Sequence, residues 1–213
     1  MIEKNIANAV KQLLEDSPER KFRESVDMAI NLKNLDMSQP KYRVDEMIVL
    51  PKGLGKSRKI AVFAKGDVGL QAKNAGADFV LTEEDIEELG ADKSKARTLA
   101  NNCDSFIAEV QYMALIGKSL GAILGPRGKM PIPLTADKNV VDMINTTKNS
   151  IRVRSKDKLT FHVAVGSREM SLDDLTENID TVMSRLERSL DKGKQNLKSV
   201  YVTTTMGNSV RLV

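Results

Sequence analysis

The feature that most constrains the fold is a change of hydrophobic period along the chain. Residues 26–33 alternate apolar and polar side chains, and residues 159–165 do so again near the other end. A period of two is typical of strands with one buried and one solvent-facing side. Between these segments, residues 60–64 form a continuous apolar run, as expected of a strand that is covered on both faces. The chain is therefore expected to contain two kinds of sheet.

The middle of the chain alternates segments of strand and helix character. Strands are expected at residues 60–64, 79–81 and 106–110, and helices at 68–75, 83–89, 113–120 and 137–146. Thr82 and Asp85 have the spacing of a capping box, which marks the start of a helix. Strands that alternate with helices at this spacing predict a small parallel α/β sheet.

The two ends of the chain combine period-two strands with amphipathic helices. Helices are expected at residues 2–14 and 172–190, and strands at 26–32, 43–50, 159–165 and 200–206. Neither end section is complete alone. The sequence therefore predicts an α+β domain built from both termini, residues 1–58 and 151–213, which is interrupted by an α/β domain of residues 59–150.

Composition excludes several classes of function. Cys103 is the only cysteine and His162 the only histidine, so intramolecular disulfides, histidine-rich zinc sites and Cys–His nucleophile pairs are not expected. No apolar stretch is long enough to span a membrane, and the N-terminus lacks the layout of a secretory signal. The sequence predicts a cytoplasmic protein without a metal or cofactor.

Charge is unevenly distributed along the chain. The two end sections together carry an excess of five positive charges, and residues 59–150 carry one excess negative charge. This asymmetry fits a polyanion-binding body with a separate insert, and it equally fits ordinary scatter.

An enzyme built on the α/β section would need a phosphate-binding loop. Three Gly-Lys pairs, at residues 55–56, 117–118 and 128–129, lack the earlier glycine that this loop requires. The acidic cluster of residues 83–88 has no histidine or cysteine near it, which favours a solvated helix face. The alternative of a nucleotide- or sugar-phosphate-using enzyme therefore has no motif to support it.

Residues 151–158 carry a cation at every second position, namely Arg152, Arg154, Lys156 and Lys158. If the segment is extended, these side chains share one face, where they repel one another unless an anion lies opposite. A phosphate backbone would meet that need through sequence-independent contacts. The alternative is a charged face that only resists edge-to-edge aggregation. We favour the interpretation that this basic segment binds a polyanion.

The last expected strand carries Tyr201, Thr203 and Thr205 on one face and leads into Met206 and Gly207. Threonine hydroxyls both donate and accept hydrogen bonds, so they can reach phosphate, ribose or base groups. Gly207 would allow a partner to come close. The preference of threonine for strands explains the same residues without any partner.

Four stretches together resemble the ribosomal protein L-one family, whose members form the mobile side stalk of the large ribosomal subunit beside the tRNA exit site. They are residues 203–207 (Thr-Thr-Thr-Met-Gly), 22–26 (Phe-Arg-Glu-Ser-Val), 50–56 (Leu-Pro-Lys-Gly-Leu-Gly-Lys) and 161–166. Their order covers nearly the whole chain. The loop of residues 125–131 is similar to the archaeal branch, and Asn208 stands where the family usually has proline.

The resemblance implies a two-domain protein whose termini form an RNA-binding α+β domain around a Rossmann-like, three-layer α/β insert. It implies a structural, non-enzymatic protein that binds large-subunit ribosomal RNA, is a monomer when free and needs no cofactor. Its own messenger RNA, whose translation it would repress, and exit-site tRNA are implied as further partners. Residues 51–56 and 149–150 are expected to be the two crossings of a hinge.

The resemblance also implies which residues contact RNA. Those that match the family motifs are Phe22, Ser25, Thr203, Thr205, Met206 and Gly207. A second group is supported more by the strand-face argument than by motif identity, and its members are Arg43, Arg152, Arg154, Lys156, Lys158 and His162.

Overall fold

The computed structural model of the chain describes residues 2–18, 20–135 and 139–212. The chain divides into two units, the terminal unit (Met1–Lys56 and Asn149–Val213) and the insert (Ser57–Lys148). Each of the two crossings between them lies two residues before the boundary expected from sequence. The fold class is confirmed, because both termini build an α+β unit and an α/β unit is inserted between its two segments in the chain order.

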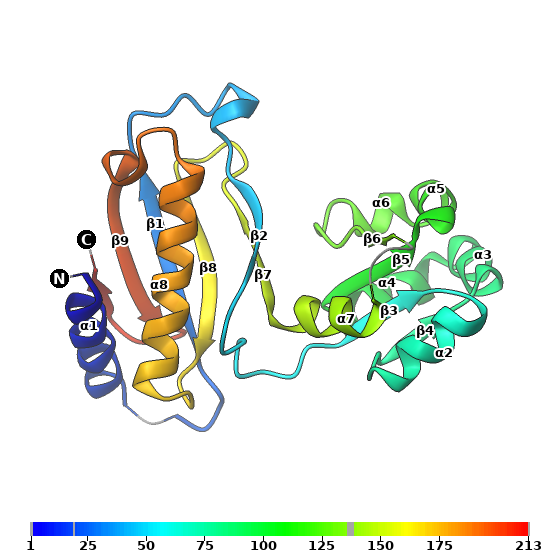
Figure 1. The fold of residues 1–213 in the computed structure, drawn as a ribbon, viewed down its shortest axis with the longest axis horizontal. Coiled ribbons are helices and arrows are strands. Elements are labelled where there is room, and N and C mark those ends of the chain that lie inside the picture. Colours follow the sequence, from blue (N-terminus) through cyan, green and yellow to red (C-terminus); the bar gives the residue numbers. More distant parts are fainter. Residues whose placement is uncertain (1, 19, 136–138, 213) are drawn as a thin grey trace. The chain divides into compact units, whose positions relative to one another are not determined.

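The terminal unit is an antiparallel sheet with helices packed against it (Figure 1). Its four-stranded sheet has the order β10-β9-β1-β8. The strands are β1 (Ser25–Leu32), β8 (Thr160–Ser167), β9 (Leu197–Thr204) and β10 (Ser209–Arg211). The helices are α1 (Ile2–Asp16), α8 (Leu172–Ser189) and the short 3-10 helices η1 (Pro40–Tyr42) and η2 (Gly193–Asn196).

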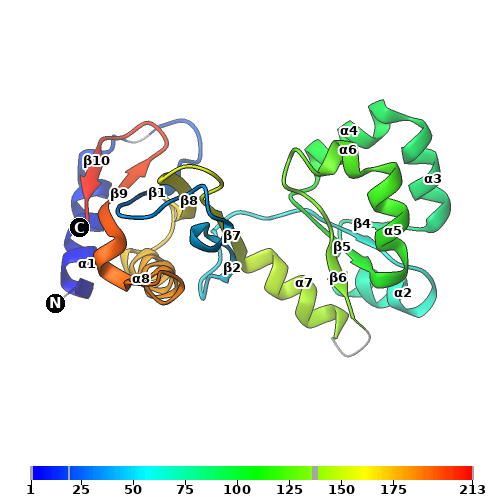
Figure 2. The ribbon, with the colours of Figure 1, turned by 90° about the horizontal axis from the view of Figure 1, so that it is seen from above.

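Alternation along the strands decides which side of this sheet is buried. In β1, Val26, Met28 and Ile30 are fully buried, whereas the residues between them are half-buried. Both α1 and α8 pack against the buried side, as Figure 2 shows from above, and their apolar residues join those of the strands in one core. No helix of the described residues covers the other side, which we call the open face.

A two-stranded antiparallel ribbon adjoins the crossings between the units. It consists of β2 (Asp45–Val49) and β7 (Ser150–Arg154). Its inward residues Ile48, Ile151 and Val153 are buried in the same core as the four-stranded sheet. The ribbon is therefore part of the terminal unit.

The strand expected over residues 151–158 ends at Arg154. Residues 155–158 form a tight turn in which Lys156 has a φ of 51°, and the Lys158 N–H donates to the Ser155 carbonyl at 3.1 Å. Lys156 and Lys158 therefore do not continue the strand face of Arg152 and Arg154. The expected face of four cations is wrong, because the chain must turn here to enter β8.

The insert is a parallel sheet covered on both sides. Its strands, in the spatial order β4-β3-β5-β6, are β3 (Ile60–Phe63), β4 (Phe79–Leu81), β5 (Ser105–Glu109) and β6 (Ile132–Leu134). One side packs against α2 (Gly66–Asn74) and α7 (Val140–Asn149). The other packs against α3 (Glu83–Ala91), α4 (Lys93–Asn102), α5 (Val110–Ser119) and α6 (Gly121–Leu124). All of β3 is buried, which explains its continuous apolar run.

Besides the short 3-10 helices η1 and η2, the sequence does not predict α4, α6, β6 and β10. The buried residues of α4 are Ala96 and Ala100, which are too small to produce a clear hydrophobic period. The other three elements have three or four residues, too few for any period to show. The helix expected over 137–146 falls partly outside the described residues, and the observed α7 begins at Val140.

Candidate nucleic-acid interface

The open face of the four-stranded sheet presents rows of mostly polar side chains. Read from β8 through β1 to β9, the rows are Thr160–Asn31–Ser199, His162–Ala29–Tyr201 and Ala164–Asp27–Thr203. His162 is exposed, while Phe161 and Val163 on either side of it are buried. The face can therefore form many hydrogen bonds but carries few charges, which suits base and ribose groups better than phosphates alone.

Side-chain contacts fix parts of this face. Thr160 Oγ1 donates to Asn31 Oδ1 at 2.7 Å, and Asn31 Nδ2 donates to Ser199 Oγ at 2.9 Å. Lys56 Nζ reaches the same sheet and lies 2.5 Å from the Ser25 hydroxyl oxygen. Burial raises the pKa of Asp27, and the positive charge of Lys56 partly opposes that rise. The face thus combines an ordered polar row with a carboxylate beside a cation.

Three loops meet just beyond Ser25, around the carboxylate of Glu24, which is only 1% exposed. Arg168 Nη1 lies 3.3 Å from Glu24 Oε2, and Arg20 Nε lies 3.5 Å from Oε1. The backbone N–H of Met206 donates to Oε1 at 3.2 Å. Glu24 thereby joins residues 20–25, 167–169 and 204–207, which we call the end cluster.

Thr205 is exposed in the end cluster, but its hydroxyl is engaged within the protein. The Ser25 N–H donates to Thr205 Oγ1 at 3.0 Å, and the Thr205 N–H donates to the Ser25 carbonyl at 3.1 Å. Gly207 has no room for a side chain, because a Cβ would collide with Thr204 Oγ1 and lie 2.7 Å from Ser17 Oγ. Both residues are therefore required by the packing of the end cluster itself.

Two large apolar side chains are exposed on this fixed frame. Phe22 is 49% exposed and Met206 is 62% exposed. The turn that carries Met206 is closed by Thr203, whose hydroxyl donates to the Gly207 carbonyl at 3.2 Å. Exposed apolar side chains on ordered loops are typical of binding surfaces, and unstacked RNA bases are partners for such side chains.

Arg152 and Arg154 both contact Asp45 on the neighbouring strand of the ribbon. Arg152 Nε and Nη2 donate to the two oxygens of Asp45 at 2.7 and 2.8 Å, and Arg154 Nε lies 3.2 Å from Oδ2. The hydrogen bonds from Arg152 hold the pKa of Asp45 below its ordinary value. The protein's own carboxylate thus lies opposite the basic strand, so repulsion between Arg152 and Arg154 does not by itself require a phosphate there.

Arg43, Lys156 and Lys158 lie away from the end cluster. Arg43 Nη2 is 3.3 Å from Asp157 Oδ1 in the turn before β8, and the two lysines are exposed in that turn. The end cluster lies at the other end of β8, whose eight residues span on the order of 25 Å. The expected residues therefore form two groups, one on the open face and end cluster and one on the ribbon and its turn.

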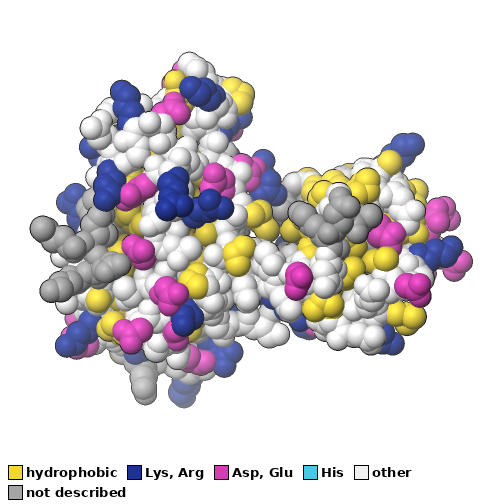
Figure 3. Space-filling model, in the orientation of Figure 1, with side chains coloured by type: hydrophobic (Ala, Val, Ile, Leu, Met, Phe, Trp, Pro, Cys, Tyr) yellow, Lys and Arg dark blue, Asp and Glu magenta, His cyan; other side chains and the backbone are white. Residues whose placement is uncertain are grey.

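The helix-covered side of the terminal unit carries charges of both signs. Figure 3 shows Lys and Arg interleaved with Asp and Glu on this side. Lys52 Nζ, for example, lies 3.6 Å from Asp174 and 3.5 Å from Glu177 of α8. The described residues of this side therefore offer a polyanion no continuous positive surface.

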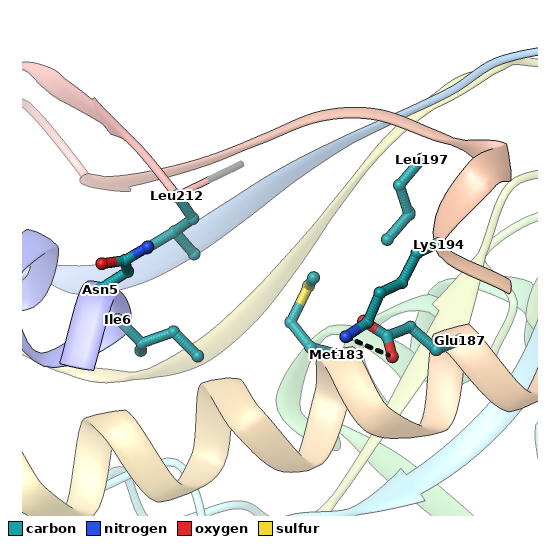
Figure 4. A pocket seen from close by; sticks show the side chains of 7 residues that line it. All are labelled: Asn5, Ile6, Met183, Glu187, Lys194, Leu197 and Leu212. Carbon is teal, nitrogen blue, oxygen red and sulfur yellow. Dashed lines mark ion pairs between the residues drawn. The ribbon is translucent and has the colours of Figure 1, made fainter. Parts of the chain in front are cut away.

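A pocket of about 300 Å³ opens among α1, α8 and η2 (Figure 4). Its apolar walls include Ile6, Met183 and Leu197, and its lysine, Lys194, lies 3.7 Å from Glu187. Because the two charges match, the pocket has no excess positive charge with which to bind a phosphate.

The insert has a topological switch point between β3 and β5, where α/β enzymes commonly bind ligands. Glu109 lies there at the end of β5, where its Oε1 accepts the Lys65 N–H at 3.2 Å and its Oε2 accepts a hydrogen bond from Gln111. Cys103 is fully buried, and burial raises the pKa of its thiol to about 11. A protonated, buried thiol is a poor nucleophile.

Clusters of metal-ligating side chains and membrane-spanning helices are both absent from the described part of the chain. No cluster of three or more His, Cys, Asp or Glu there could hold a metal ion. None of the described helices is long and apolar enough to cross a membrane.

Sequence reasoning missed five residues of the interface, Glu24, Asp27, Asn31, Lys56 and Arg168. Asp27 and Asn31 alternate with core residues of β1, so the period of two could have placed them on the open face. Lys56 and Arg168 reach the sheet from distant parts of the chain, and no local pattern signals that. Glu24 stands within a recognised motif, but its burial depends on the packing of three loops.

Comparisons with known proteins give the family. The sequence matches the Ribosomal protein L1p/L10e family over residues 7–208. "Large ribosomal subunit protein uL1" of Methanococcoides burtonii is 76% identical over 213 residues, the full length of both chains. Proteins of the same name from Methanosarcina mazei and Haloarcula marismortui are 65% and 48% identical, also over the full length of both chains. The resemblance drawn from four short motifs is therefore confirmed, and this chain belongs to the Ribosomal protein L1p/L10e family.

Proposed function

We propose that this chain is a structural protein of the large ribosomal subunit that binds large-subunit ribosomal RNA and forms the mobile side stalk near the tRNA exit site. Relatives named as large-subunit ribosomal proteins match it over their full length. The observation that best supports an RNA contact is the open face, which is polar and has no covering helix among the described residues. The end cluster beside it exposes the apolar side chains of Phe22 and Met206.

The two groups of residues would contribute different contacts. The rows of the open face would form hydrogen bonds with bases and ribose, and the end cluster would pack its apolar side chains against unstacked bases. Arg43, Lys156 and Lys158 would add phosphate contacts that do not depend on sequence. Arg152 and Arg154 would do so while keeping their contacts with Asp45.

The same surface supports two further parts of the proposal. A segment of the chain's own messenger RNA that has the shape of the ribosomal RNA site would bind the same open face. Messenger RNA and ribosomal RNA would then compete for the protein, and the bound messenger would be repressed. Exit-site tRNA would be a neighbour of the protein in the stalk. The free protein would be a cytoplasmic monomer that becomes ribosome-bound.

An enzyme on the insert is the rejected alternative. The family consists of structural proteins, and the relatives carry the name of a ribosomal protein. At the switch point where such an enzyme would bind substrate, both carboxylate oxygens of Glu109 already have partners within the protein, the Lys65 N–H and Gln111.

The test is titration of the chain with transcripts that tile large-subunit ribosomal RNA, each at several salt concentrations. One transcript should bind on the order of 10³-fold more tightly than unrelated RNA of equal length. Phe22→Ala and Met206→Ala should each weaken that complex about 10-fold without changing its salt dependence, because each removes apolar contact and no charge.

The matched control is Leu70→Ala, which truncates an apolar side chain of the insert that is 63% exposed. It should leave RNA binding unchanged. Equal binding to every transcript would contradict the proposed function. An effect of Leu70→Ala as large as that of Met206→Ala would contradict the placement of the contact on the end cluster.

A further inference from the structure

Asp27 is a carboxylate at the centre of a surface that we assign to a polyanion. It lies on β1 in the row between Ala164 of β8 and Thr203 of β9, and its side chain is half-buried. A carboxylate repels phosphate, so it weakens contacts with an RNA backbone. Its presence there calls for a partner that donates hydrogen bonds.

The protein itself does not satisfy this carboxylate. Among the described residues, no hydrogen bond or ion pair is made by the side chain of Asp27, whereas the carboxylates of Glu24 and Asp45 each have several close partners. The charged groups that influence Asp27 are Lys56 and His162, and Lys56 Nζ makes its close contact with Ser25 instead. Burial raises the pKa of Asp27, as expected of an acceptor that has lost water without gaining a donor.

The bases differ in what they offer to a carboxylate. Guanine presents two neighbouring donors, N1–H and N2–H, on its Watson–Crick edge, and these match the two acceptor oxygens of a carboxylate. Adenine and cytosine present one amino group beside a ring nitrogen that accepts hydrogen bonds, and this nitrogen would face the second oxygen. Uracil has a single N–H between two carbonyl groups. A carboxylate therefore selects guanine.

We propose that Asp27 is a specificity-determining residue that accepts hydrogen bonds from N1–H and N2–H of one unstacked guanine of the bound RNA. This inference rests on the proposed function, since it assigns a base to the same open face. Tyr201 lies in the adjacent row and offers an aromatic ring on which a neighbouring base can stack. Lys56 offers a positive charge beside the carboxylate, where the backbone of the same nucleotide would need one.

The test is analogue interference with the full-length chain and the transcript that it binds most tightly. Guanosine is replaced at random by inosine, which lacks the N2 amino group, and in a second pool single 2′-hydroxyls are removed. Wild type and Asp27→Asn each select bound RNA from both pools. At one guanosine, inosine should weaken wild-type binding about 10-fold and should have no effect on Asp27→Asn.

Asp27→Asn should itself weaken binding of the unmodified transcript about 10- to 100-fold, since an amide offers one acceptor where the carboxylate offers two. Its affinity for unrelated RNA should stay equal or rise, because a negative charge has been removed. Asp180→Asn on α8 is the matched control and should behave as wild type in both pools. Cooperative thermal melting of every variant, with none less stable than wild type, checks that the fold is intact.

Each other outcome overturns the inference. Identical inosine patterns for wild type and Asp27→Asn would mean that Asp27 reads no guanine. A position that depends on Asp27 only in the 2′-deoxy pool would mean that Asp27 reads ribose. Failure of wild type to distinguish any ribosomal transcript from unrelated RNA would instead remove the proposed function, and the inference with it.

Discussion

The insert covers both faces of its four-stranded sheet with helices, whereas the terminal unit covers only one face of a sheet with the same number of strands. In the insert, every residue of β3 is buried. In the terminal unit, β1 buries every second residue and leaves Asp27 and Asn31 half-exposed between them. A sheet face without a covering layer is available to a partner, which is why we propose that RNA is recognised by the terminal unit.

The two units also use buried or half-buried carboxylates differently. Glu109 lies at the switch point of the insert and accepts hydrogen bonds from Lys65 and Gln111. Glu24 instead joins three loops of the terminal unit and binds the backbone N–H of Met206, whose side chain is exposed. Glu109 therefore contacts the backbone and a neighbouring side chain of its own unit, whereas Glu24 fixes the loops of the proposed RNA site.

The largest expected effect comes from separating the two units. Residues 1–56 joined to 149–213 by a short Gly-Ser linker should bind the ribosomal transcript within about threefold of the whole chain. A short linker suffices because the Leu50 N–H donates to the Asn149 carbonyl at 2.9 Å, so the two crossings lie side by side. The isolated insert, residues 57–148, should bind it on the order of 10³-fold more weakly. Circular dichroism checks folding, and a folded terminal unit without specific binding would break the comparison.

The next largest effect is on the free energy of unfolding, and it differs between Glu24 of the terminal unit and Glu109 of the insert. Glu24→Ala should lower the free energy of unfolding of the terminal unit by about 2–3 kcal/mol, because Arg168 and the Met206 N–H lose a buried charged partner. Glu109→Ala should cost the insert about 1 kcal/mol or less, because Glu109 is only half-buried. Calorimetry of each variant resolves the two units if they melt separately. Equal losses would show that Glu24 has no special role in the end cluster.

The fold follows from the sequence wherever elements are long enough for a period to appear. Alternation over residues 26–32 and the apolar run over residues 60–64 predict the one-sided and two-sided sheets that are observed. Prediction fails for α4, whose buried residues are alanines, and for the residues after Arg154, where a left-handed turn at Lys156 interrupts an extended pattern. The position of this turn depends on how β7 is connected to β8 in the folded unit, and the alternation of charged residues carries no information about that connection.

The interface is less predictable than the fold, because its contacts join distant segments. The motif around Met206 and the outward face of His162 are recognisable locally. The pairing of Asp45 with Arg152 is not, since the two residues are 107 positions apart. The position of Lys56 beside Ser25 likewise depends on the path of the chain near the crossing.

Thr205→Val tests the contribution of a single hydroxyl in the terminal unit and is compared with a similar substitution in the insert. It should destabilise the terminal unit by about 1 kcal/mol and weaken RNA binding by a similar amount, because the Ser25 N–H loses its acceptor at the edge of the interface. Thr98→Val on α4 of the insert is the control, since its hydroxyl donates only to a carbonyl within its own helix. Thermal melts and RNA titrations measure the two effects. Unchanged melting of Thr205→Val would mean that the Ser25 contact contributes nothing.

Single lysines should have smaller effects, visible in the salt dependence of binding. Lys156→Ala and Lys158→Ala should each reduce the slope of log affinity against log salt by somewhat less than about one unit, as expected for one lost phosphate contact. Lys93→Ala, an exposed lysine of the insert, should leave the slope unchanged. If all three slopes stay the same, the turn before β8 is a solvated surface and the RNA contact is confined to the open face and end cluster.

The smallest expected effect is on the pH dependence of stability and contrasts two carboxylates of the terminal unit. Arg152 lowers the pKa of Asp45 from its ordinary value of 3.8, so the stabilisation is present above that pH and is lost as the pH falls through the lower folded pKa. Because Asp45 is 39% exposed, solvent screening limits the effect to about 0.2–0.5 kcal/mol. Burial raises the pKa of Asp27, so its contribution has the opposite sign and is lost as the pH rises above 3.8.

Melting curves from acid to neutral pH for Asp45→Asn and Asp27→Asn measure these opposite signs. Relative to wild type, Asp45→Asn should be less stable at neutral pH and equal in strong acid, whereas Asp27→Asn should be slightly more stable at neutral pH. When RNA is bound, Asp27→Asn should instead be less stable than wild type. A guanine that donates hydrogen bonds to Asp27 gives the charged carboxylate the partner that it lacks in the free protein. A carboxylate that costs stability in the free protein and is needed in the complex is what distinguishes a recognition residue from a structural one. If Asp27→Asn were less stable than wild type in the absence of RNA, Asp27 would belong with Asp45 and Glu24 as part of the frame.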